Sequence, residues 1–223
     1  MTLEELFIVE LNTVLNVVNF TVKKSKAGFL AVRKYELGEQ TIFFEMGKNR
    51  GEYFYIDINL WITNLPVQRI YSLVNSINSQ KPIIVKRLSF LTKEINNGYE
   101  NFERVKFNGR YGKYISKETL EQYRINLKEC LETLIIPFFK KFSNQNSFDD
   151  YINRPLLNGN YDFEFRPIWK EAIISLIVAK LVSSKDFHFL EKIWFNQNFQ
   201  KGVGFDTKME LIKLKEILKN IEE

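Results

Sequence analysis

Residues 52–62 read EYFYIDINLWI, and the alternation of side chains along this stretch decides the fold class. Successive residues of a β-strand point to opposite faces of the sheet. Large apolar side chains hold every second position and give one face Phe54, Ile56, Ile58, Leu60 and Ile62. The other face carries Tyr53, Tyr55, Asp57, Asn59 and Trp61. We therefore predict a long strand that presses its apolar face against a core.

The residues before this strand predict a helix followed by a meander. Apolar residues recur at steps of three and four between residues 3 and 18, which is typical of an amphipathic helix, and Thr2 is a candidate N-cap. Extended segments are then expected at residues 20–24, 29–35 and 41–46. Gly28 and Gly38 lie in the intervening turns, where glycine adopts dihedrals that other residues avoid.

The residues after the strand become mostly helical. A helix is expected at about residues 65–77, with Pro66 in its first turn, before two weaker strands at 83–91 and 100–107. Ser116 is the expected N-cap of a long helix that ends before Pro137, and Ser147 caps a short turn. Further helices are expected at about 167–182, 185–196 and 206–221, the last capped by Asp206.

This order of elements predicts an α+β fold. We expect an antiparallel sheet of about five or six strands with an N-terminal helix, followed by a mostly helical C-terminal half. We expect a domain boundary after residue 155. It separates an α+β sheet domain, residues 1–155, from a helical C-terminal subdomain, residues 156–223, that packs on it. A single continuous domain is the alternative.

Composition favours a cytoplasmic globular protein without a cofactor. The 223 residues are 45% hydrophobic and 26% charged, as in average globular chains. Residues 1–6 lack the basic and apolar regions of a signal peptide, and the apolar stretch 172–182 is far shorter than the roughly 20 residues of a membrane helix. Cys130 and His188 are the single cysteine and histidine, so we expect no disulfide, no metal site and no cofactor.

The same scarcity argues against an enzyme. His188 could act as a general base oriented by Asp186, but an ordinary helix-surface or half-buried histidine fits the pattern better. Cys130 falls on the apolar stripe of its helix and is expected to pack in the core. We therefore predict a non-enzymatic protein that binds a protein partner.

Charge and aromatic patterning supply the candidate binding residues. The net charge of +5 comes from residues 81–115, which hold eight basic and three acidic side chains. Tyrosine, tryptophan and arginine are enriched at recognition surfaces. The predicted partner-binding residues are Tyr53, Tyr55, Asp57, Asn59, Trp61, Arg104, Lys106 and Arg110. The alternative is a nucleic-acid-binding or processing protein that uses the basic segment 81–115, although an excess of five charges is weak for that role.

The order and texture of three segments resemble a known bacterial family. The segments are residues 20–25 (FTVKKS), 53–60 (YFYIDINL) and 134–142 (LIIPFFKKF). Together they resemble the bacterial domain of unknown function 4304, over residues 1 to about 155. Members of that family are predicted immunity proteins of polymorphic-toxin systems, so the resemblance implies a protein that neutralises a toxin by covering its active site. It implies no catalytic residues.

Overall fold

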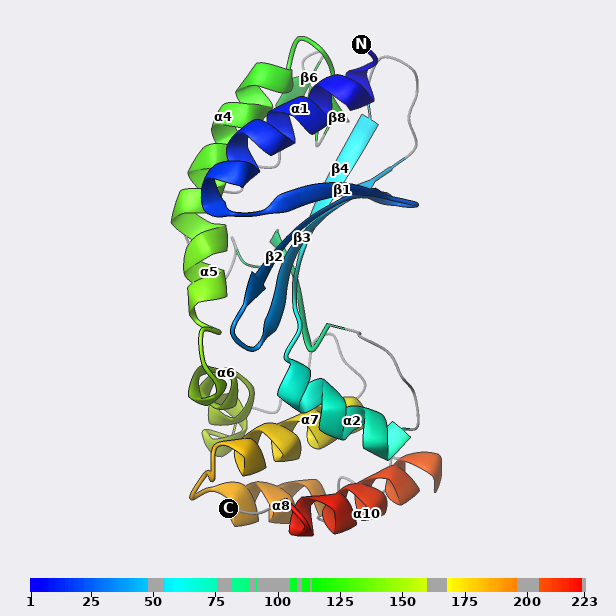
Figure 1. Ribbon diagram of the computed structural model, residues 1–223, viewed down its shortest axis with the longest axis vertical. Helices are drawn as coiled ribbons and strands as arrows, with labels where there is room; N and C mark the ends of the chain where they lie inside the picture. The colour runs from blue at the N-terminus through cyan, green and yellow to red at the C-terminus, as the bar shows by residue number, and fades with distance from the viewer. Residues whose placement is uncertain are drawn as a thin grey trace. The chain divides into compact units, whose positions relative to one another are not determined.

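The chain folds as two compact units in the computed structural model (Figure 1). Unit 1 comprises Met1–Thr63 and Ile84–Lys140, and unit 2 comprises Asn64–Ile83 and Lys141–Glu223. The structure describes residues 1–47, 54–75, 82–88, 91, 105–107, 110–112, 114–159, 168–195 and 205–221.

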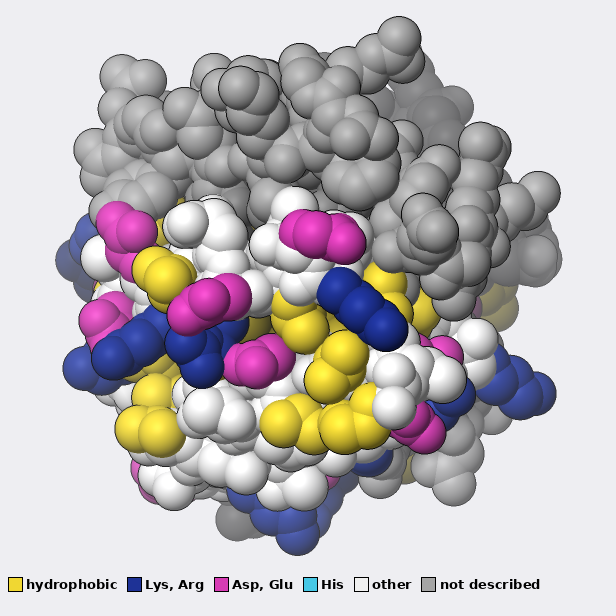
Figure 2. All heavy atoms as spheres, turned by 90° about the horizontal axis from the view of Figure 1, so that it is seen from above, with side chains coloured by type: hydrophobic (Ala, Val, Ile, Leu, Met, Phe, Trp, Pro, Cys, Tyr) yellow, Lys and Arg dark blue, Asp and Glu magenta, His cyan; other side chains and the backbone are white. Residues whose placement is uncertain are grey.

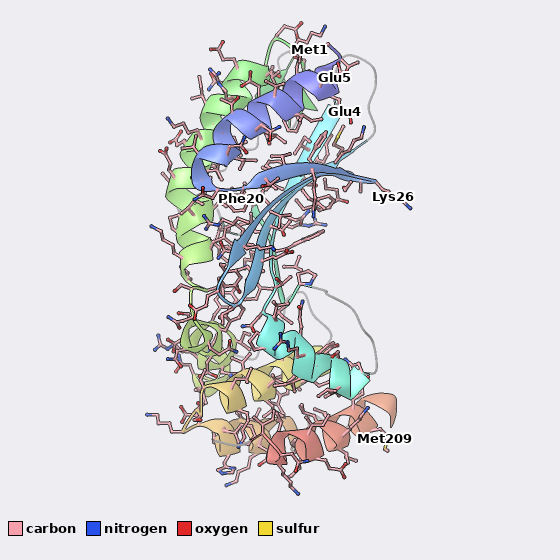
Figure 3. The ribbon with its side chains drawn as sticks, in the orientation of Figure 1. Met1, Glu4, Glu5, Phe20, Lys26 and Met209 are labelled. Atoms are coloured by element: carbon pink, nitrogen blue, oxygen red, sulfur yellow. The ribbon has the colours of Figure 1, made fainter. Side chains whose placement is uncertain are left out.

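Unit 1 begins with helix α1 (Leu3–Leu15), whose start is fixed by a capping box. The Glu5 amide donates to Thr2 Oγ1 at 3.2 Å, and the Thr2 amide donates to Glu5 Oε2 at 2.8 Å. The predicted cap is therefore confirmed. Glu4 and Glu5 lie in the first turn (Figure 3), where carboxylates offset the positive end of the helix dipole.

A sheet of antiparallel strands follows, as predicted. Its order is β1-β2-β3-β4-β5, and the short strand β8 pairs with β4. The bounds are β1 (Thr21–Ser25), β2 (Gly28–Tyr35), β3 (Gly38–Met46), β4 (Phe54–Ile62), β5 (Ile84–Arg87) and β8 (Tyr114–Ile115). A separate two-stranded sheet holds β6 (Val105–Phe107) and β7 (Arg110–Gly112). The N-terminal helix, this sheet and the mostly helical C-terminal half confirm the α+β class.

One face of the sheet, here called the inner face, packs against helices of unit 1 (Figure 1). Phe7 of α1 lies 5.7 Å from Phe29 and 6.3 Å from Phe44, measured between ring centroids. The Gln40 side chain donates to the carbonyl of Phe139 at 3.1 Å. The inner face comprises Phe29, Ala31 and Arg33 of β2, Gln40, Ile42 and Phe44 of β3, and Ile56, Ile58, Leu60 and Ile62 of β4.

The predicted helix from Ser116 to Pro137 is wrong at both ends. Helix α4 (Leu120–Cys130) begins four residues later, because the Ser116 amide donates to Thr119 Oγ1 in a turn that precedes the helix. At the other end the chain passes through a π-helical segment, η3 (Leu131–Ile135), into α5 (Ile136–Lys140). Pro137 is then the second residue of α5, a first-turn position that tolerates the missing N–H.

The described part of unit 2 is helical and contains α2 (Leu65–Asn75), α6 (Gln145–Leu157), α7 (Ile168–Leu181), α8 (Phe187–Phe195) and α10 (Phe205–Lys219). Residues 172–179 of α7 are all buried, so α7 is the central helix that the apolar stretch predicts. Buried hydrogen bonds join its Ser175 to Asn153 of α6 and Trp194 of α8.

Three expectations for unit 2 differ from the structure. Residues 145–157 form a full helix, with Asn144 as the N-cap that accepts from the Ser147 amide, where a Ser147-capped turn was expected. Helix α10 begins at Phe205, which places Asp206 inside it. The boundary predicted after residue 155 falls within α6, since this helix continues through Pro155 to Leu157.

Candidate functional site

The second face of the sheet, here called the outer face, is assembled by strand register. Leu30 lies opposite Phe43, Phe43 opposite Asn59, and Asn59 opposite Arg87. In the neighbouring row Val32 lies opposite Thr41, Thr41 opposite Trp61, and Trp61 opposite Val85. The outer face therefore includes Thr21, Lys23, Leu30, Val32, Thr41, Phe43, Glu45, Tyr55, Asp57, Asn59, Trp61, Val85 and Arg87.

An apolar cluster occupies the middle of the outer face. The rings of Phe43 and Trp61 are 4.7 Å apart between centroids, and Phe43 is only 8% exposed. Leu30, Val32 and Trp61 are half-buried. Val85 is 48% exposed. The cluster thus has a packed centre and a more accessible edge, at the edge strand β5.

Polar side chains border this cluster along β3 and β4. The Tyr55 hydroxyl donates to Asp57 Oδ2 at 3.1 Å, and the Asn59 amide donates to Glu45 Oε2 at 3.2 Å. Glu45 and Asp57 are direct cross-strand neighbours, an arrangement in which like charges repel. Each of these two carboxylates accepts one of the hydrogen bonds just described, from a side chain of the same face. The exposed Arg87 adds a cation beside Asn59.

Four of the predicted binding residues come together here, two belong to another sheet, and two lie outside the described residues. Tyr55, Asp57, Asn59 and Trp61 share the outer face, as the alternation in β4 predicts. Asn59 is the most buried of them, at 6% exposure. Tyr53 and Arg104 lie outside the described residues. Lys106 and Arg110 belong to the separate β6–β7 sheet, so these two are not part of the outer face.

Sequence reasoning missed the residues that other strands contribute to the same face. Leu30, Phe43 and Val85 are the main examples, and each lies on a strand at least partly predicted. Alternation within β2 and β3 does separate Leu30 from Phe29 and Phe43 from Phe44. It does not indicate which residues are opposite each other, because register is set by the turns and the pairing.

The groups considered for catalysis are placed as structural or surface residues. Cys130 is a buried residue of α4. The His188 side chain is 86% exposed on α8, and its Nδ1 lies 3.6 Å from Glu191 Oε2. Within the described ranges, no three His, Cys, Asp or Glu side chains gather as metal ligands. None of the helices in the described part of the chain is long and apolar enough to cross a membrane.

Ion pairs distribute charge of both signs over the helical surface of unit 1. Lys24 Nζ lies 2.6 Å from Glu4 Oε1, and Arg124 Nε lies 3.5 Å from Glu10 Oε2. Figure 2 shows cationic, anionic and apolar side chains interspersed over the described part of the face that it presents. This mixed surface contrasts with the outer face, where apolar side chains form one cluster.

Comparisons of this chain with protein-family models, with curated proteins and with solved structures found no match.

Proposed function

We propose that this protein binds another protein through the outer face of its sheet. The observation that carries the proposal is the apolar cluster of Leu30, Val32, Phe43, Trp61 and Val85, which lies opposite the helix-packed inner face. Apolar patches rimmed by polar groups mark interaction sites on protein surfaces.

The composition of the face fits recognition of a folded protein. Interface hot spots are enriched in tryptophan and tyrosine and are surrounded by polar contacts that exclude water. Trp61 is held by Phe43, and Tyr55 is held by its hydrogen bond to Asp57, so little side-chain freedom remains to be lost on binding. The rim carries Glu45, Asp57 and Arg87. We infer a partner whose apolar centre is surrounded by charges of both signs.

A toxin inhibitor is the form of this function that the family resemblance implies. An inhibitor of that kind acts by covering an active site, which needs a shaped surface and no reactive group of its own. The proposed function is therefore non-enzymatic binding, and a bacterial toxin is the proposed partner class.

Site-specific photo-crosslinking in the cells that make this protein tests the proposal. A benzoylphenylalanine replaces Val85 in one variant and Ile125 in a matched control. Ile125 lies on α4 and is 51% exposed, against 48% for Val85. We expect position 85 to yield a discrete protein adduct that position 125 does not yield. Equal adducts at both positions, or none at position 85, would overturn the proposal.

The captured protein then supplies a quantitative assay. Val85→Lys should weaken its affinity at least about tenfold, equivalent to about 1.4 kcal/mol, because a charge would be buried in the apolar contact. Ile125→Lys should leave the affinity within about twofold, a difference of about 0.4 kcal/mol. Both variants should unfold at nearly the same urea concentration as the parent protein, since each replaces an exposed side chain.

A further inference from the structure

Arg33 places a positive charge on the inner face, in the same row as Gln40. In the strand register Arg33 lies opposite Gln40, and it follows the buried Ala31 by two residues on the same face of β2. Phe20 precedes β1 (Figure 3), and Phe139 belongs to α5. The fold thus brings a cation beside two neighbouring aromatic rings from distant parts of the chain, whose centroids are 5.9 Å apart.

The guanidinium of Arg33 is held in one orientation by these neighbours. Its Cζ lies 4.7 Å from the ring centroid of Phe20 and 5.7 Å from that of Phe139, both within the range of cation–π attraction. Nε donates to Gln40 Oε1 at 2.7 Å, and Nη1 donates to the Val18 carbonyl at 3.4 Å. Gln40 is itself fixed by its bond to the Phe139 carbonyl.

All of these partners are neutral. In the part of the chain that the structure describes, the ion pairs involve other basic residues, and none involves Arg33. Burial lowers the pKa of Arg33, because the charged form loses contact with water. An arginine has five N–H donors. Two are used by Gln40 and Val18, which leaves three for groups outside the protein.

We propose that the guanidinium of Arg33 is a binding site for an oxyanion, either a phosphate or a carboxylate. Arg33 is half-buried, so part of the residue remains in contact with solvent. A planar guanidinium presents parallel donors that match two oxygens of such an anion. Because Phe20, Phe139 and Gln40 already hold the plane, binding loses little side-chain freedom. This site lies on the opposite side of the sheet from the outer face and is independent of the proposed function.

Side-chain NMR of the intact protein tests the site directly. The Nε–H signal of Arg33 is followed while inorganic phosphate is added, and in a second arm sodium acetate is added, with sodium chloride at matched ionic strength as the reference. We expect a saturable shift of the Arg33 signal with at least one of the two anions, and no such shift with chloride. The arm that saturates identifies the anion class. A response that stays linear in both arms, or that equals the chloride response, would overturn the proposal.

Two conservative variants distinguish the contribution of the parallel N–H donors to anion affinity from the contribution of the positive charge. Arg33→Lys keeps the positive charge but loses the parallel donors, so the anion affinity should fall at least about tenfold. Arg69→Lys replaces an exposed arginine of α2 and should leave the affinity unchanged. Equal affinities in Arg33→Lys and the parent protein would contradict the site. If Arg33→Lys does not fold, the titration of the parent protein still decides the question.

Discussion

Removal of one hydroxyl from the core of unit 2 should cost far more than its size suggests. Ser175 of α7 is fully buried. Its Oγ donates to Asn153 Oδ1 and accepts from Trp194 Nε1 at 2.9 Å. Ser175→Ala therefore leaves one buried acceptor and one buried donor without this partner. Each such group costs about 1–3 kcal/mol, so the free energy of unfolding should fall by about 2–6 kcal/mol.

Urea denaturation followed by circular dichroism measures this loss. With a slope of about 2 kcal/mol per molar urea, the midpoint should fall by roughly 1–3 M. Ser72→Ala is the matched control, because the Ser72 hydroxyl donates to the Arg69 carbonyl near the surface of α2 and its loss should cost less than about 0.5 kcal/mol.

A double variant isolates the bond to the indole. Combining Ser175→Ala with Trp194→Phe also removes the indole N–H that donates to Ser175. The decrease in the free energy of unfolding should therefore be smaller than the sum of the two single decreases, by about 1 kcal/mol. The reasoning is refuted if Ser175→Ala lowers the midpoint no more than Ser72→Ala does.

Three further substitutions test local features of the fold. Burial raises the pKa of Asp149, so the charged carboxylate destabilises the folded state at pH values above that raised pKa. This cost vanishes below the ordinary pKa of 3.8, where the carboxyl is protonated in both the folded and the unfolded state. Asp149→Asn should therefore raise the urea midpoint of unfolding at pH 7 and leave it unchanged at pH 3. Gly28→Ala should lower the free energy of unfolding, measured by urea denaturation, by about 3 kcal/mol or more, because φ is +144° and a Cβ would lie 2.0 Å from the Phe44 carbonyl oxygen. Gly159→Ala, at φ +76° in open space, should cost only about 1 kcal/mol. Thr2→Ala removes the side-chain half of the capping box and should cost about 1 kcal/mol, measured in the same way.

The proposed protein-binding site and the proposed anion site lie on opposite faces of the sheet. The outer face offers an apolar cluster with a polar rim to a protein partner. The inner face is committed to packing on α1 and α5, yet it retains one cation with unused donors at Arg33. Val85→Lys and Arg33→Lys should therefore act independently: the first should weaken protein binding alone and the second anion binding alone.

Local patterns of sequence were enough to place most elements and their buried sides. Strict alternation in residues 54–62 separates Ile56 from Tyr55, and the strand pairs as that pattern predicts. Thr2 and Glu5 are three residues apart, so the residue types and spacing of a capping box can be recognised in the sequence alone. The stretch that became α7 is apolar all round, which is typical of a central helix. Each of these signals depends on neighbours within one or two turns of the chain.

Other features depended on partners that are distant in the sequence, and only the tertiary structure decided them. Phe43 and Val85 join Trp61 on the outer face because of strand register. Arg33 meets Phe139 because α5 packs on the inner face, more than 100 residues further along the chain. Pro137 was read as a helix end, but the π-helical segment before it lets the helix continue. The physical reason is common to all three: periodicity shows which side of an element is buried, whereas the energy of packing and pairing selects what that side is buried against.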